Sequence, residues 1–86
     1  MKKSNLDPQI VEAVFTMYKN AKYLREQHGL STEEMAKIIE ISEKKLIMAE
    51  ACVETECFYD MHIKNICEYF QVTANDLFTK KIYEEL

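Results

Sequence analysis

The chain has 86 residues, 48% of them hydrophobic and 30% charged, so we expect one folded domain with a modest core. Its formal net charge of −4 gives no general encouragement to nucleic-acid binding. No apolar run approaches the roughly 18 to 20 residues of a membrane span, no basic segment precedes an apolar block, and three cysteines, an odd number, argue against a disulfide framework. These features predict a cytoplasmic protein that is not associated with a membrane.

Charge is distributed unevenly along the chain. Residues 1–30 sum to +2, residues 31–60 to −5 and residues 61–86 to −1. The acidic groups therefore concentrate in the central third, where they would oppose contact with the phosphates of DNA.

The first predicted element is a long helix from about Pro8 to His28. Asp7 suits an N-cap and Pro8 suits the first helical position, while Gly29 can take the left-handed conformation that ends a helix. Apolar side chains recur between these ends at helical spacing, at Ile10, Val14, Tyr18, Ala21 and Leu24, with Val11 and Phe15 widening the stripe.

Four shorter helices are predicted to follow. Ser31 and Glu34 form a capping box that opens the second helix, and Ser42 can cap a third. A fourth should begin near Asp60, and Thr73 with Asp76 predicts a short fifth. With one glycine, one proline and no alternating run, the chain is expected to be all-α.

The stretch from about residue 20 to residue 78 resembles the helix-turn-helix of the phage-repressor family, the Cro/Xre type. The matching pieces are "LREQHGLSTEEMAKII", the "IS" before the third helix, Glu50 near that helix's end, and "VTANDLF". The resemblance implies a five-helix, lambda-repressor-like DNA-binding domain with an N-terminally extended first helix. It covers about residues 20–78 of a single domain spanning 1–86, with the extension over about 8–20 and a tail over about 79–86.

In that family the third helix enters the major groove of DNA. Carried over to this chain, the resemblance implies candidate DNA contacts at Thr32, Ser42, Glu43, Lys44, Lys45, Ile47 and Met48. Of these, the serine and the lysines suit phosphate or base contacts, whereas Glu43 can accept only from a cytosine amino group. For Ile47 and Met48, a partner-binding surface and local packing against the following loop both stay open.

Several positions depart from the family pattern. Glu40 stands at the corner where the family usually has glycine, which favours a corner rebuilt as a more helical link. The loop after the third helix carries Glu54 and Glu56 where the family approaches phosphate, and both would oppose it.

The extended first helix predicts a homodimer. Ile10, Val11, Val14, Phe15 and Tyr18 present more apolar surface than a short extension can bury, so a two-fold pairing of helices is expected to cover it. The alternative is that the stripe folds back on the domain itself, beneath the tail that carries Ile82, Tyr83 and Leu86.

Few residue patterns in the sequence indicate a catalytic site or a metal site. Cys52, Cys57, His62 and Cys67 recur every five residues, a step that turns a helix by about 500° and leaves successive members on different faces. No phosphate loop and no set of nucleophile, base and orienting residue is visible, so we expect no cofactor, no metal and no enzyme activity. Two functions remain: a DNA-binding transcriptional regulator acting as a dimer, and a degenerate helix-turn-helix that binds another protein, such as a repressor modulator.

Overall fold

The computed structural model describes residues 7–84, which form five α-helices and one short 3-10 helix. The helices are α1 (Pro8–Gln27), α2 (Thr32–Ile39), α3 (Glu43–Glu50), α4 (Asp60–Phe70) and α5 (Ala74–Thr79), followed by η1 (Ile82–Glu84). The described part contains no strand, which confirms the expected all-helical class. Within it, no helix is both long and apolar enough to cross a membrane.

The predicted caps are present at the helix starts. The Asp7 side chain accepts from the Gln9 N–H at 2.7 Å, ahead of Pro8. At α2 the capping box is complete, because the Ser31 hydroxyl accepts from the Glu34 N–H at 3.0 Å and the Ser31 N–H donates to the Glu34 carboxylate at 2.8 Å.

Ser42 caps α3 and Thr73 caps α5 in the same way, each accepting from the backbone N–H three residues on, at 3.2 and 3.0 Å. Each cap satisfies an amide that would otherwise lack a partner, so the local sequence sets these helix starts.

The corner between α2 and α3 is left-handed, and the expected helical link is wrong. Glu40 has φ 65° and ψ 45°, and the N–H groups of Glu40 and Ile41 both bond to the Ala36 carbonyl. Gln71 ends α4 with the same geometry, at φ 59°. The two bonds to the Ala36 carbonyl close the end of α2 and offset the cost of a left-handed glutamate.

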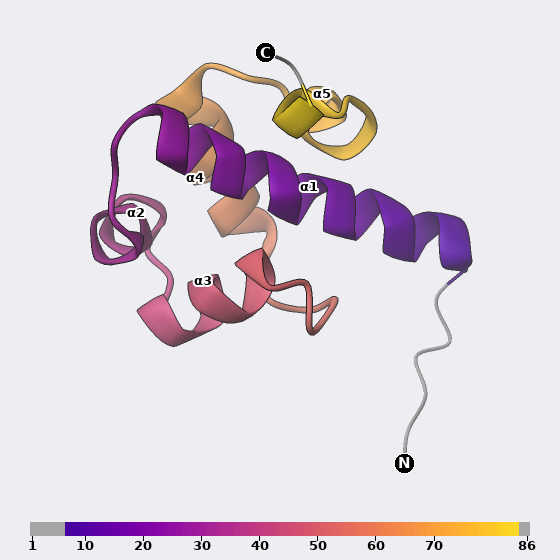
Figure 1. Cartoon of the computed structure of the whole chain (residues 1–86), viewed down its shortest axis with the longest axis horizontal. Helices are drawn as coiled ribbons and strands as arrows, with labels where there is room; N and C mark the ends of the chain where they lie inside the picture. The colour runs from indigo at the N-terminus through magenta and orange to yellow at the C-terminus, as the bar shows by residue number, and fades with distance from the viewer. Residues whose placement is uncertain (1–6, 85–86) are drawn as a thin grey trace.

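The first helix, α1, runs through the middle of the domain (Figure 1). It packs against α3, α5 and η1, while α4 packs against α2 and α5. In Figure 1, α2 and α3 lie on one side of α1, α5 lies on the other, and α4 passes behind. The fully buried side chains from these elements include Tyr18, Met35, Ile39, Leu46, Ile66 and Leu77.

Two polar side chains of α1 fasten the irregular parts of the chain to this core. The buried Asn20 amide donates to the Leu77 and Lys80 carbonyls at 2.8 and 2.7 Å and accepts from the Tyr83 N–H at 3.1 Å. The Tyr18 hydroxyl accepts from the Cys57 N–H at 2.9 Å. One side chain therefore holds the tail, and the other holds the loop between α3 and α4.

The placement of Tyr18 corrects its assignment to a dimer interface. Its side chain is 1% exposed, and its ring meets Phe58 edge-on with centroids 5.0 Å apart. Because Tyr18 is enclosed by the loop of its own domain, it cannot contribute to a surface between two chains. Ile10 is 49% exposed, whereas Val11, Val14 and Phe15 are half-buried.

Ala36→Leu should destabilise the domain. Ala36 is 5% exposed within the core cluster of α2 and α3, so a leucine overpacks that contact and should cost about 1–3 kcal/mol. Thermal denaturation measures the effect. An unchanged melting temperature would contradict close packing at this position.

Tyr18→Phe should alter the response of stability to alkaline pH. Burial is the main cause that raises the pKa of Tyr18 to about 12, whereas an unfolded tyrosine ionises near pH 10. The unfolded chain therefore releases this proton first, so the native protein should lose stability as pH rises from about 10 to about 12.

Urea denaturation at pH 8 and pH 11 should show a smaller loss of stability for Tyr18→Phe than for the native chain. At pH 8 the variant should be less stable by about 1–3 kcal/mol, because the Cys57 N–H loses its acceptor. Equal losses in both proteins between the two pH values would contradict the assignment.

Candidate nucleic-acid interface

The inner face of α3 is fixed to the domain. Leu46 and Ala49 are both fully buried, and Met48 is half-buried and packs against the core. The Met48 carbonyl also accepts from the Val53 N–H at 3.3 Å, within the turn that follows α3. The Met48 side chain therefore packs within its own domain and is not part of an open partner-binding surface.

The outer face of α3 is open to solvent. Ser42, Glu43, Lys44 and Lys45 are exposed, and the Ile47 side chain is 50% exposed. Neither lysine forms an ion pair with another residue in the range 7–84. Two unpaired ammonium groups and one apolar side chain are thus available to a ligand on this face.

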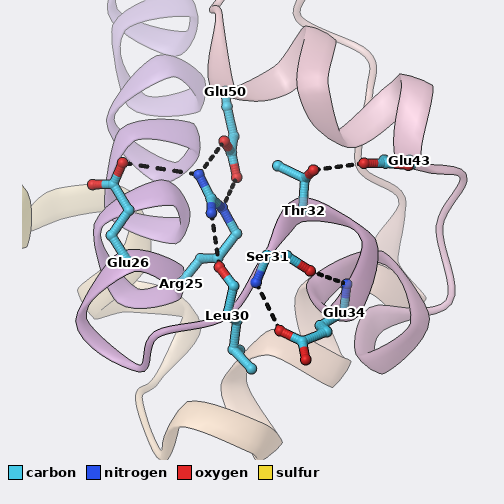
Figure 2. Close-up of polar contacts among 8 residues, drawn as sticks. All are labelled: Arg25, Glu26, Leu30, Ser31, Thr32, Glu34, Glu43 and Glu50. Atoms are coloured by element: carbon cyan, nitrogen blue, oxygen red, sulfur yellow. Dashed lines mark hydrogen bonds and ion pairs between the residues drawn. The ribbon is translucent and has the colours of Figure 1, made fainter.

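The position of α3 depends on an ion pair with α1, drawn in Figure 2. The Arg25 Nε and Nη2 atoms donate to the two carboxylate oxygens of Glu50 at 2.7 and 3.0 Å, and Nη1 donates to the Leu30 carbonyl at 2.8 Å. The two side chains are only 13% and 8% exposed. The hydrogen bond to Glu50 is the main cause that raises the pKa of Arg25.

This pairing joins three segments at one guanidinium group. Because α1, the α1–α2 connection and the end of α3 all meet Arg25, the outer face of α3 has a fixed direction relative to the rest of the domain. A bidentate pair with low exposure is also far more specific in geometry than a surface ion pair.

A second contact joins the starts of α2 and α3. The Thr32 hydroxyl donates to a Glu43 carboxylate oxygen at 2.6 Å, as Figure 2 shows. The structure therefore brings two of the candidate DNA contacts together, at the end of α3 that would face a groove. The bond occupies the hydroxyl proton of Thr32 and holds a negative charge beside the first turn of α3.

The surroundings of α3 are acidic. Glu33 and Glu34 occupy the first turn of α2, where Glu33 is 3.9 Å from Lys37 and Glu34 completes the capping box. Glu54 and Glu56 are exposed in the loop after α3. This charge opposes phosphate, although the lysines at 44 and 45 offset it locally.

The three cysteines have thiols whose pKa is raised by their surroundings. Burial raises the pKa of all three thiols, which keeps them protonated at neutral pH. Cys57 lies in the loop between α3 and α4 but is only 2% exposed, and its backbone N–H donates to the Tyr18 hydroxyl. Among residues 7–84, no three His, Cys, Asp or Glu side chains are grouped so as to hold a metal ion.

Sequence reasoning missed the residue of α1 that positions α3 and the residue of α1 that holds the C-terminal tail. Glu50 was noted at the end of the third helix, but its partner Arg25 was not singled out. Asn20 was also missed, although it follows Thr16 by one helical turn on the buried side of α1. The available signal was an amide side chain on the mostly apolar face of α1, because a buried amide requires hydrogen-bond partners.

Comparisons of the chain with protein-family models, with characterised proteins and with solved structures give no match.

Glu50→Gln should destabilise the domain strongly. It leaves the Arg25 charge without its carboxylate in a site that excludes most water, which typically costs about 3 kcal/mol or more. The matched control is Glu33→Gln, which breaks an exposed pair and should change stability by less than about 1 kcal/mol. Chemical denaturation measures the free energy of unfolding of both variants. Equal losses would show that the Arg25–Glu50 pair stabilises the domain no more than an exposed ion pair does.

Proposed function

We propose that this protein is a DNA-binding transcriptional regulator of the helix-turn-helix type, resembling the phage-repressor family, which inserts α3 into the major groove. The observation that carries the proposal is the division of α3 into two faces. Leu46 and Ala49 are buried, while Lys44, Lys45 and Ile47 face solvent.

The α2–α3 corner supports the same proposal. A short helix, a left-handed residue at Glu40 and a second short helix capped by Ser42 form a compact unit whose second helix is exposed on one side. In a helix-turn-helix protein, such a helix contacts base edges with its N-terminal residues. Here those residues are Glu43, Lys44 and Lys45. A reducing cytoplasm suits this role, because all three cysteines are free.

Binding in this orientation depends on the two lysines for its favourable charge. Each lysine that neutralises a phosphate releases about one counterion, which sets the salt dependence of the affinity. Glu43 opposes phosphate but can accept a hydrogen bond from a cytosine amino group through the carboxylate oxygen that does not accept from Thr32. The acidic surroundings should make binding weak on random DNA and more dependent on base contacts.

Lys44→Ala/Lys45→Ala should weaken binding to duplex DNA and flatten the plot of log affinity against log salt by up to about two units, one for each lost phosphate contact. Fluorescence anisotropy with a random duplex, and with duplexes enriched by selection, measures both quantities. The control is Lys64→Ala/Lys80→Ala, which removes the same charge from α4 and the end of α5. Unchanged affinity and slope in the first variant would exclude this docking.

A second candidate function is protein binding through the same face. It is favoured by the carboxylate that Thr32 holds at the start of α3 and by the exposed Ile47 side chain. The Glu43 carboxylate beside an exposed apolar side chain offers a basic, amphipathic partner segment both an ion pair and an apolar contact.

Glu43→Gln distinguishes the two functions in the same titration. It keeps an acceptor for Thr32 and removes one negative charge, so a DNA-binding protein should bind random duplex more tightly. If neither the native chain nor Glu43→Gln binds any duplex at low salt, the protein-binding function replaces the first proposal.

A further inference from the structure

An open groove lies where α1, the end of α3 and the C-terminal tail meet. It has a volume of about 410 Å³, and its lining includes Lys19, Lys22 and Glu26 of α1, Glu50 and Cys52 from the end of α3 and the turn after it, and Tyr83 of η1. Pockets that hold small molecules typically measure about 300–1,000 Å³. The groove is therefore large enough for a small ligand, and its walls come from three separate segments of the chain.

Arg25 is the partner of both carboxylates in the groove. The Glu50 carboxylate accepts from its guanidinium at 2.7 and 3.0 Å, and a Glu26 carboxylate oxygen lies 3.8 Å from the same group, as Figure 2 shows. Three cationic side chains, Arg25 and the two lysines, thus stand against two carboxylates. The balance leaves the groove with a net positive charge.

The two lysines of the groove have no carboxylate partner. Neither Lys19 nor Lys22 forms an ion pair with any other residue that the structure describes. The nearby end of α3 also has its carbonyls in use, since those of Ile47, Met48 and Ala49 accept from N–H groups of the following turn at 2.9 to 3.3 Å. The two ammonium charges are therefore available to an anion.

Both ammonium groups act on the same part of the groove. The Lys19 Nζ atom lies 5.4 Å from the centroid of the Tyr83 ring, and the buried Asn20 amide holds Tyr83 by accepting from its backbone N–H at 3.1 Å. Burial raises the pKa of the Cys52 thiol, and Lys19 and Lys22 each oppose that rise. Two positive charges therefore reach the wall of the groove beside one side chain.

We propose that this groove binds a small phosphorylated molecule, whose phosphate group lies between Lys19 and Lys22. A phosphate monoester carries about −1.5 to −2 charges at neutral pH, which matches two unpaired ammonium groups better than a carboxylate does. Lysine suits this role because its ammonium is a compact charge with three donors. The Tyr83 ring and the Ala51 side chain, which also line the groove, offer an apolar contact to the organic part of the ligand.

The groove is separate from the surface proposed to bind DNA. The candidate DNA contacts at Thr32 and at residues 42–45 lie at the starts of α2 and α3, whereas the groove lies at the opposite end of α3. A ligand in the groove contacts α1, the end of α3 and the tail at once. It should therefore stabilise the folded domain.

Titration of the full chain, labelled with 15N, with adenosine monophosphate (AMP) at low salt and without DNA tests the proposal by NMR. AMP should bind saturably, with the largest shifts at residues 19–23, 50–52 and 83. Inorganic phosphate should compete with AMP because it offers the same group. Adenosine, which lacks the phosphate, should not bind.

Lys19→Ala/Lys22→Ala should weaken AMP binding at least about tenfold, because it removes both charged donors. The matched control is Lys37→Ala/Lys64→Ala, which removes the same charge from exposed lysines of α2 and α4 that pair with glutamates. The control should bind AMP as the native chain does. Circular dichroism of both variants establishes that they remain folded.

Alkylation of Cys52 gives a second measurement at the groove itself. Cys52 and Cys67 are both half-buried free thiols, but Cys52 lines the groove whereas Cys67 lies on α4. With iodoacetamide at one fixed pH, AMP should slow the modification of Cys52 and leave that of Cys67 unchanged, as followed by mass spectrometry. The bound phosphate would cover the Cys52 thiol and neutralise the ammonium groups that lower its pKa.

Three results would overturn the proposal. No saturable binding of AMP at millimolar concentration, or equal binding of adenosine, would exclude a phosphate site. Equal weakening in the two double variants would show a general attraction to positive charge instead of a site. Binding of AMP that leaves the alkylation of Cys52 unchanged would place the ligand elsewhere.

A titration with random duplex distinguishes a small ligand from the phosphates of DNA. Lys19→Ala/Lys22→Ala should bind duplex as tightly as Lys37→Ala/Lys64→Ala does, because the groove lies away from the start of α3. A larger loss in the groove variant would assign the two lysines to the DNA backbone and overturn the small-ligand proposal. If no variant binds duplex, the function proposed for α3 fails while the AMP titration still decides on the groove.

Discussion

The arrangement of the helices around α3 depends on the ion pair between Arg25 and Glu50. Helices as short as α2 and α3, with eight residues each, are marginal in isolation and take their stability from packing. Arg25 reaches the end of α3 and the Leu30 carbonyl before α2 with one rigid group. Because a guanidinium offers its donors in a fixed plane, this contact sets the angle as well as the distance between the segments.

Other polar contacts extend the same principle to the irregular segments. Asn20 holds the chain after α5 through three hydrogen bonds, and Tyr18 holds the loop after α3 through one. The Asn65 amide joins α4 to the end of α2 by donating to the Ile39 carbonyl at 3.0 Å. Buried apolar contacts favour compactness without specifying a direction, whereas these bonds select one arrangement.

The outer face of α3 combines geometry suited to DNA with charge that opposes it. The ion pair and the buried Leu46 direct Lys44 and Lys45 outward, yet Thr32 fixes the Glu43 carboxylate at the same end. If α3 binds DNA as proposed, nonspecific attraction to phosphate is weaker than for a basic helix, and the proposal requires discrimination by individual base contacts. The same carboxylate suits a basic peptide, which is why the two proposed functions share one surface.

The sequence by itself determined the helical class and the starts of most helices, because caps and apolar spacing are local. Ser31, Ser42 and Thr73 each bond to an amide three residues on, so no distant contact is required to predict them. Ala21 and Leu24, which the helical spacing of apolar residues placed on one stripe of the first helix, are likewise buried. The prediction of a helical link at Glu40 was wrong. The free-energy cost of a left-handed glutamate can be judged from the local sequence, but the hydrogen bonds of the turn and the packing of α2 on α3, which offset that cost, cannot.

Only the tertiary structure decided how far along α1 the domain covers its apolar stripe. Ile10, Val14 and Tyr18 occur at one helical spacing and look equivalent in sequence, yet Tyr18 is enclosed and Ile10 is half exposed. Tyr18 is enclosed because the loop between α3 and α4 reaches α1 there, with the Cys57 N–H bonded to its hydroxyl and Phe58 against its ring. The partners of Arg25 and Asn20 were hidden for the same reason. Glu50 and the partners of Asn20 lie 25 to 63 residues away in the chain, and only the fold brings them together.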